Sequence, residues 1–247
     1  MEPVYSAVIG FARLVFAAEG LKFTITGTEH VPRTGGAVMV LNHTGYMDFT
    51  YAGFAAVPAH RLVRFMAKDS VFRHRVSGPL MRAMKHIPVD RSAGAASYQS
   101  AVEALRRGEI VGVFPEATIS RSFELKEFKN GAARMAKEAG VPLLPTVIWG
   151  SQRVWTKDHP KRLGRTGTPI SIDVGAPVPV GADEDPDAAT ARVREVMTRM
   201  LHAAQERYEP LTGAERVFLP ARLGGDAPTP ERAAELDEKE RLHRAQR

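Results

Sequence analysis

His43 and Asp48 are the two residues of this sequence whose types and spacing best suit proton transfer. An imidazole accepts a proton near neutral pH, and a carboxylate on its other ring nitrogen fixes the tautomer and stabilises the protonated form. Positions five apart on a straight helix lie roughly 140° apart, so the two side chains meet only if a turn separates them. Thr44 and Gly45 suit such a turn. The pair therefore predicts a base dyad.

Polar or proline-containing segments follow apolar runs at several further places. His43 itself follows the apolar residues 37–41, a run short enough to be a buried strand. The others read I-P-V-D-R at 87–91, F-P-E-A-T-I-S at 114–120 and V-P-L-L-P at 141–145. We expect each to lie at the end of a strand.

In this order and at these intervals, the four segments resemble the motifs of the glycerolipid acyltransferase family, typified by 1-acylglycerol-3-phosphate acyltransferase. That family carries N-H-x-x-x-x-D, a hydrophobic stretch ending in D/N-R, F-P-E-G-T-R-S, and V-P-x-x-P. The resemblance covers roughly residues 20–180. It implies that His43 deprotonates an acceptor hydroxyl, which attacks the thioester of an acyl-CoA or an acyl-carrier protein directly. No acyl-enzyme is implied, and the chain has neither a G-x-S-x-G elbow nor a cysteine.

The resemblance also implies roles for two carboxylates. Asp48 is expected to orient His43, a role that is compatible with capping a helix. Glu116 is expected to bond an acceptor hydroxyl or backbone amides of the site, with a buried ion pair as the alternative.

Phosphate binding is expected from a second group of residues. Thr118 and the backbone of Ala117 can hold phosphate at the start of a turn. Arg91 matches the family's second motif, which is tied to the acceptor's phosphate, and its planar guanidinium suits that task. Lys68 and Arg121 are further candidate ligands of the phosphate.

The third motif departs from the family at two positions. Ala117 stands where the family has Gly, and Ile119 stands where it has an Arg that often binds phosphate. Either Arg121 replaces this guanidinium through a bend in the loop, or the acceptor is not lysophosphatidate.

Composition narrows the classes of function. The chain has no cysteine, which excludes thiol catalysis, disulfide scaffolds and cysteine-based zinc sites. Its eight histidines show no tight ligand spacing, so we expect no metal and no cofactor besides the acyl donor. Residues 61–91 hold eight Lys or Arg against two Asp, which accounts for the net charge of +6. Such a patch suits phosphate ligands, an anionic membrane or nucleic acid, or is a solvated face.

Strands alternate with helices along the chain, which predicts an α/β fold with a mostly parallel central sheet flanked by helices. Ligands of such sheets bind beyond the carboxyl ends of the strands, where we expect His43, Arg91 and Glu116 to converge. The expected strands span residues 23–26, 37–41, 62–67, 86–89, 110–114, 143–148 and 170–174, and the expected helices span 97–107, 131–139 and a long stretch from 185.

Three regions are expected: residues 1–19, an acyltransferase domain of 20–210, and a polar linker with a charged tail at 211–247. Residues 4–18 have apolar side chains at helical spacing but are short of the ~20 residues that span a bilayer. An amphipathic helix at the membrane interface fits, as does a helix packed on its own domain, and the resemblance favours the membrane. With no signal peptide visible, we expect a peripheral protein on the cytoplasmic side of the cell membrane.

The leading hypothesis is acyl transfer to a lysophospholipid, most simply lysophosphatidate giving phosphatidate. A different lipid or glycolipid acceptor is the alternative that Ile119 suggests. An inert membrane- or nucleic-acid-binding protein is the alternative of another class. Residues 153–165 are basic, contain Trp155 and follow Trp149, so they suit contact with lipid headgroups or with the phosphates of coenzyme A. A nucleic-acid binder shows such a stretch as well, but no recognised nucleic-acid motif accompanies it, so nucleic acid is not expected as a partner.

Overall fold

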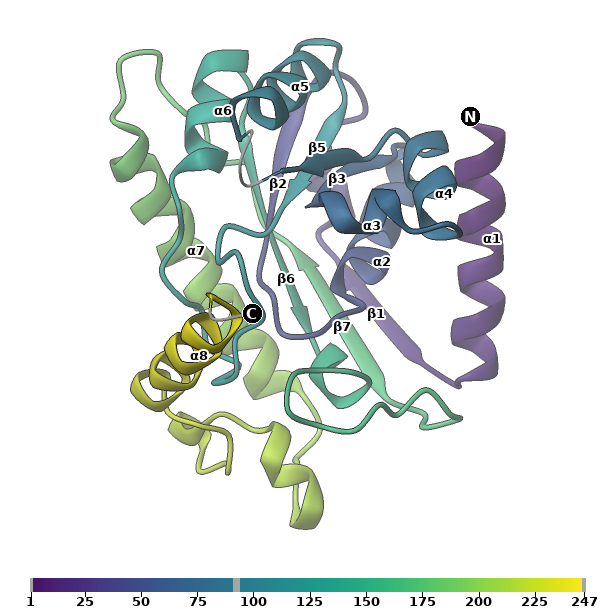
Figure 1. The fold of residues 1–247 in the computed structure, drawn as a ribbon, viewed down its shortest axis with the longest axis vertical. Helices are drawn as coiled ribbons and strands as arrows, with labels where there is room; N and C mark the ends of the chain where they lie inside the picture. Colours follow the sequence, from purple (N-terminus) through teal and green to yellow (C-terminus); the bar gives the residue numbers. More distant parts are fainter. Residues whose placement is uncertain (1, 91–93, 246–247) are drawn as a thin grey trace.

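The computed structural model describes residues 2–90 and 94–245, and its centre is a seven-stranded sheet with helices on both faces (Figure 1). The strand order is β1-β7-β6-β2-β5-β3-β4, and β6 and β7 form the one antiparallel pair among the described strands. The expected α/β fold is confirmed. The strands are β1 (Lys22–Thr26), β2 (Ala37–Leu41), β3 (Val63–Lys68), β4 (Ile87–Val89), β5 (Ile110–Val113), β6 (Leu143–Trp149) and β7 (Pro169–Val174).

The helices vary from single turns to the long α7, which starts where the sequence predicts, with the side chain of Asp185 accepting from the amide of Asp187. The α-helices are α1 (Pro3–Ala18), α2 (Asp48–Ala52), α3 (Asp69–Arg73), α4 (Ser77–Ala83), α5 (Gly94–Arg106), α6 (Gly131–Ala139), α7 (Pro186–Arg207) and α8 (Pro230–Ala245). The 3₁₀ turns are η1 (Thr28–His30), η2 (Gly53–Ala59), η3 (Ser151–Arg153), η4 (Gly213–Phe218) and η5 (Ala221–Leu223).

The sheet is buried on both faces, which explains why its central strands read as continuous apolar runs. All five residues of β2 are buried, and they alternate between two cores. Val38 and Val40 pack with α5, α6 and α7, whereas Met39 and Leu41 pack with α1, α2 and η2. Figure 1 shows these two helical layers on opposite sides of the sheet.

One edge of the sheet collects three of the four segments. The fourth, residues 141–145, leads into β6 and so lies at the opposite edge, where the expectation of a strand end is wrong. Because β2, β3, β5 and β6 run parallel, their carboxyl ends lie at the same edge. His43 follows β2, Lys68 ends β3, Glu116 follows β5 and Ser151 follows β6. The topology therefore brings together residues that are more than 100 positions apart in sequence.

Helix α1 packs on the domain with one face and leaves the other exposed. Tyr5 and Phe16 are buried, and the Tyr5 hydroxyl donates to the Val63 carbonyl at 2.8 Å. On the opposite face, Phe11 and Leu14 are 69% and 72% exposed. One face of α1 therefore packs on its own domain, and the other face is exposed and free to contact a membrane. Within residues 2–90 and 94–245, no helix combines the length and apolarity needed to cross a bilayer.

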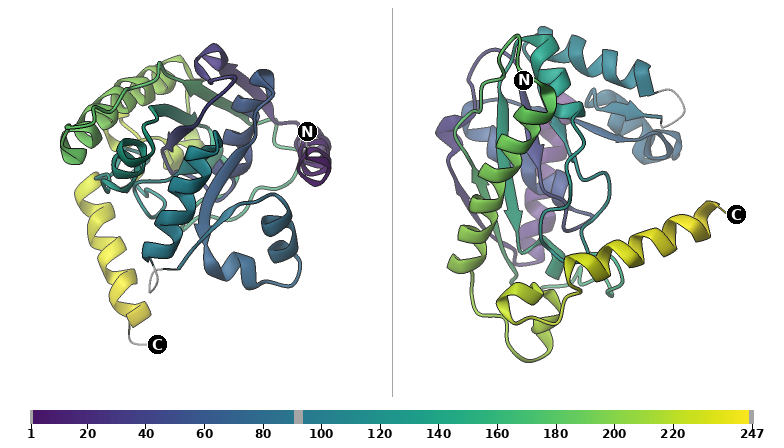
Figure 2. Two further views of the ribbon diagram at one scale, coloured as in Figure 1. Left: turned by 90° about the horizontal axis from the view of Figure 1, so that it is seen from above. Right: turned by 90° about the vertical axis from the view of Figure 1, so that its left-hand side faces the viewer.

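The chain after residue 210 differs from the predicted flexible linker. Leu211, Phe218 and Ala227 are buried in the core that α7 covers, so this segment is docked. These apolar residues stand singly among Gly, Pro and charged residues and do not recur at helical or strand spacing. The sequence pattern therefore gave no indication that the segment packs on the core. Helix α8 then extends beside the body of the molecule (Figure 2).

Part of the basic stretch 61–91 is structural. Arg64 is 4% exposed and pairs with Glu2 and Glu109 at 2.8 and 3.2 Å. Arg61 donates to three backbone carbonyls. These guanidiniums hold chain segments together, so the charge of the stretch overstates the positive surface that is free for a ligand.

Candidate active site

His43 and Asp48 form a hydrogen-bonded pair at the end of β2. His43 Nδ1 lies 2.9 Å from Asp48 Oδ2. The same carboxylate oxygen accepts from the amides of Thr44 and Gly45 at 2.8 and 2.9 Å, and the Ser151 hydroxyl donates to Oδ1. The predicted turn at Thr44-Gly45 thus wraps around the Asp48 carboxylate, which is fully buried.

The orientation of the imidazole follows from these contacts. A carboxylate that faces Nδ1 selects the tautomer with the proton on Nδ1, so Nε2 keeps its lone pair. The ring also packs against the Phe114 ring, with centroids 4.4 Å apart. The His43 side chain is 22% exposed. A partly open imidazole that is fixed from two sides can act as a general base.

Glu116 bonds backbone amides, one of the expected alternatives. Its Oε1 accepts from the His43 amide at 2.9 Å, and its Oε2 accepts from the Lys126 amide at 3.0 Å. Glu116 therefore ties the end of β2 to the loop after β5. Burial raises the pKa of Glu116 to about 8, although the two amides and the charge of Lys126 oppose the rise.

We expect Glu116 to make the stability of the protein depend on pH. The pKa is about 8 in the folded protein and close to the ordinary 4.5 in the unfolded chain. Between these values the folded state holds a proton that the unfolded state has lost, so the free energy of unfolding falls as the pH rises, by about a few kcal/mol in all. Burial lowers the pKa of His86 to about 4, so this histidine makes both proteins more stable as the pH rises toward its ordinary value of 6.5. The measure is therefore the difference between the two proteins: in urea unfolding between about pH 5 and pH 8, the stability of the wild type should fall relative to that of Glu116→Gln. Equal slopes would mean that Glu116 is ionised throughout.

The residues of the third motif that were expected to hold phosphate have hydrogen-bond partners within the protein. Ala117 has φ of +62°, and its amide donates to the Phe114 carbonyl at 3.1 Å, so the expected phosphate donor already has a partner. The Thr118 hydroxyl accepts from Lys126 Nζ at 2.7 Å. Ile119 is 3% exposed. Ile119, at the position of the family's Arg, is thus part of the protein interior. Ala117, at the position of the family's Gly, adopts the left-handed backbone conformation that glycine adopts most easily.

The candidate cations lie in different surroundings. Arg121 is held by the carboxylates of Asp158, Asp237 and Glu240, with Nε to Asp158 at 2.5 Å and Nη2 to Glu240 at 2.9 Å. In this structure the guanidinium therefore faces carboxylates from distant segments, and its role toward a substrate stays a prediction. Lys68 is exposed at the end of β3. Arg91 lies outside the described residues.

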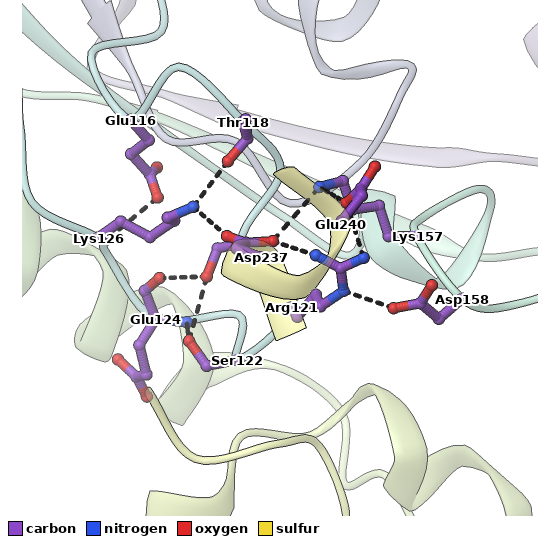
Figure 3. A network of polar contacts seen from close by, with 11 residues as sticks. Glu116, Thr118, Arg121, Ser122, Glu124, Lys126, Lys157, Asp158, Asp237 and Glu240 are labelled. Carbon is purple, nitrogen blue, oxygen red and sulfur yellow. Dashed lines mark hydrogen bonds and ion pairs between the residues drawn. The ribbon is translucent and has the colours of Figure 1, made fainter. Parts of the chain in front are cut away.

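Sequence reasoning missed two residues of this region, Ser151 and Lys126. Ser151 is fully buried and holds Asp48. It follows β6 as His43 follows β2, so the same strand-end argument identifies it. Lys126 contacts Asp237, a carboxylate partner of Arg121, and no motif marks it (Figure 3). Lys157, which contacts the same carboxylate, belongs to the basic stretch 153–165 that the sequence analysis named. Within the described chain, no group of three or more His, Asp or Glu side chains is arranged to hold a metal ion.

Comparison with known proteins agrees with the geometry. A family model described as Acyltransferase matches residues 22–149. A 1-acyl-sn-glycerol-3-phosphate acyltransferase of Bacillus subtilis is 32% identical over 123 residues, which are 49% of this chain and 60% of that protein. The protein of that name from Borreliella burgdorferi is 30% identical over 56% of each chain. The match thus spans little more than half the length of these relatives.

Two further matches cover more of the chain. The 1-acyl-sn-glycerol-3-phosphate acyltransferase of Limnanthes douglasii is 29% identical over 82% of this chain and 71% of its own length. The crystal structure of a 1-acyl-sn-glycerophosphate acyltransferase, PlsC, from Thermotoga maritima superposes with a TM-score of 0.68 over 83% of this chain and 81% of that chain, at 21% identity. At 21% identity, this structural similarity supports the fold and nothing further.

Proposed function

Because the chain belongs to the glycerolipid acyltransferase family, we propose that it is an O-acyltransferase with a lysophospholipid acceptor, most simply converting lysophosphatidate to phosphatidate. The acyl donor is acyl-CoA or an acyl-carrier protein. The observation that carries the proposal is the His43–Asp48 pair at the carboxyl edge of the sheet, with Nε2 of His43 left as an acceptor. No cofactor is needed besides the donor.

The proposed reaction is a direct transfer. His43 Nε2 takes the proton of the acceptor hydroxyl, and the oxygen attacks the carbonyl carbon of the thioester. The tetrahedral intermediate collapses with cleavage of the C–S bond, and the leaving thiolate takes the proton from the imidazolium. Asp48 stabilises the imidazolium that exists between these steps. Glu116 acts by positioning, because it bonds the backbone amide of His43.

A different lipid or glycolipid acceptor is the second candidate. It is favoured by Ile119, which is buried where the family places an Arg, and by Arg121, which is paired with carboxylates rather than open.

Thiol release from palmitoyl-CoA or oleoyl-CoA separates these candidates. The assay compares lysophosphatidate, other lysophospholipids and no acceptor. Release that requires lysophosphatidate supports the first candidate, and release with another acceptor alone supports the second. A folded protein that releases thiol with none of them contradicts both.

We further propose that the protein acts at the membrane surface, where its lipid substrates reside, on the cytoplasmic side that supplies the acyl donor. The exposed apolar face of α1 is the contact, because Phe11 and Leu14 project from the face opposite the buried Tyr5 and Phe16.

Replacing Phe11 and Leu14 together with serine should lower partitioning onto anionic vesicles by about tenfold or more, since two large apolar side chains no longer enter the bilayer interface. Vesicle co-sedimentation measures the change. The matched control is Leu242→Ser, which alters an exposed leucine (49%) on α8. Removing all of α1 is a poorer test, because it also uncovers the core contacts of Tyr5 and Phe16. Undiminished co-sedimentation of the double variant would exclude α1 as the contact.

A further inference from the structure

Three cationic side chains gather beside the third motif: Arg121, Lys126 and Lys157, here called the cationic cluster (Figure 3). Lys126 Nζ donates to Thr118 Oγ1 at 2.7 Å, and the Lys126 amide donates to Glu116. Glu116 in turn accepts from the His43 amide. The cationic cluster is therefore joined to the base dyad through a single carboxylate.

Helix α8 places two carboxylates on the cationic cluster. Asp237 contacts all three cations, with Lys157 at 3.4 Å. Glu240 lies 2.9 Å from Arg121 and 3.0 Å from Lys157. Without α8, Asp158 would be the one ion-pair partner left to the cluster among residues 2–90 and 94–245. Two positive charges would then be unmatched.

Little besides charge holds α8 in place. Among residues 230–243, Ala233 is the one buried side chain. Burial alone would raise the pKa of Asp237, but the hydrogen bond from Lys126 and the surrounding cations hold this pKa below its ordinary value, so the carboxylate is ionised. Asp237 and Glu240 remain 19% and 25% exposed. Arg121 and Lys157, at 8% and 11% exposed, are more enclosed because α8 covers them, and both gain water when it leaves. Since water reaches the carboxylates, the pairs weaken with salt, and such a helix can leave without unfolding the domain.

Without α8, the two unmatched positive charges of the cluster would be balanced by a phosphate monoester. A phosphate monoester carries close to two negative charges near neutral pH and offers three acceptor oxygens. An Arg fork with two Lys ammonium groups is a suitable set of donors for it. In the structure the two carboxylates of α8 supply negative charge to these same cations.

We propose that the cationic cluster is a binding site for a phosphate monoester of the substrates, and that α8 closes this site with Asp237 and Glu240 until the phosphate displaces them. The proposal rests on the proposed function in taking the phosphate to be a substrate's. The acceptor lipid and the 3′-phosphate of coenzyme A both carry this group.

The test compares Asp237→Asn/Glu240→Gln with a matched control, Glu235→Gln/Glu238→Gln, whose carboxylates pair with Arg232 and Arg241 of α8 itself. The probe is sn-glycerol 3-phosphate. In the wild type and the control, the probe should accelerate hydrogen exchange of residues 230–245 several-fold. In the first variant, exchange should be fast without the probe, and the apparent Kd for the probe should be about tenfold lower because no competing state remains. Equal Kd values, or an α8 whose exchange ignores the probe, would overturn the proposal.

Two further measurements assign the site and its ligand. Adding Lys157→Gln to the Asp237→Asn/Glu240→Gln background should reverse the gain in affinity, and an unchanged affinity would place the probe elsewhere. Coenzyme A and dephospho-coenzyme A separate the two sources of phosphate. If coenzyme A, but not its dephospho form, releases α8, the site serves the donor; if glycerol 3-phosphate alone does so, the site serves the acceptor. None of these readouts requires turnover, so they stand even if no acceptor is acylated.

Discussion

Replacing His43 with alanine is expected to lower kcat by about 10²–10⁴-fold, the usual contribution of general-base assistance. The fold should tolerate the change. The ring is partly exposed, and Asp48 keeps the amides of Thr44 and Gly45 and the hydroxyl of Ser151 as donors. Thiol release from acyl-CoA with the preferred acceptor measures the loss, and urea unfolding measures stability.

His202→Ala is a suitable control for this experiment, because His202 is another partly exposed histidine that pairs with a carboxylate, Glu124, at 3.2 Å. Its turnover should stay close to that of the wild type. A folded His43→Ala protein with undiminished turnover would contradict the proposed base and, with it, the direct mechanism.

Asp48→Asn should also reduce kcat strongly, on the order of 10³–10⁴-fold, while leaving the fold nearly intact. Three N–H groups converge on Oδ2, whereas Oδ1 receives the hydroxyl of Ser151. An asparagine can keep its carbonyl oxygen toward the three N–H groups and turn its NH₂ toward Ser151, whose hydroxyl rotates to accept. What is lost is the negative charge that stabilises the imidazolium.

Asp48→Ala separates this effect from simple unfolding. Without any acceptor, the amides of Thr44 and Gly45 are buried and unsatisfied, which costs about 1–3 kcal/mol for each group. We therefore expect Asp48→Ala to lose both stability and activity, and Asp48→Asn to lose activity alone. An Asp48→Asn variant that turns over like the wild type would restrict Asp48 to a structural role in the turn.

The central sheet and the approach of His43 to Asp48 could be predicted because each depends on short-range patterns. A buried parallel strand requires a continuous apolar run, which residues 37–41 supply, and parallel strands carry the residues that follow them to one edge. The turn at Gly45 is local as well. The family that these segments indicated is confirmed by the family model that matches residues 22–149.

The surroundings of Arg121 could not be predicted in this way. Its partners Asp237 and Glu240 lie 116 and 119 residues further along the chain. Ion pairs between charged side chains leave no period in a sequence, and α8 has charges on all sides. The same holds for Lys126, whose amide meets Glu116 through the shape of a loop and not through a motif.

The strand order also has a consequence for how the protein is made. Strand β2 lies between β5 and β6, and Asn42 closes the ladder by exchanging hydrogen bonds with Ile148, 106 residues later. A nascent chain emerges from the ribosome at about 5–20 residues per second, so β6 is synthesised several seconds or longer after His43. During that interval the edge of β2 that faces β6 in the folded protein has no partner. Helix α8 is synthesised after every residue of the cationic cluster. The nascent domain therefore passes through a stage in which α8 does not yet cover that cluster.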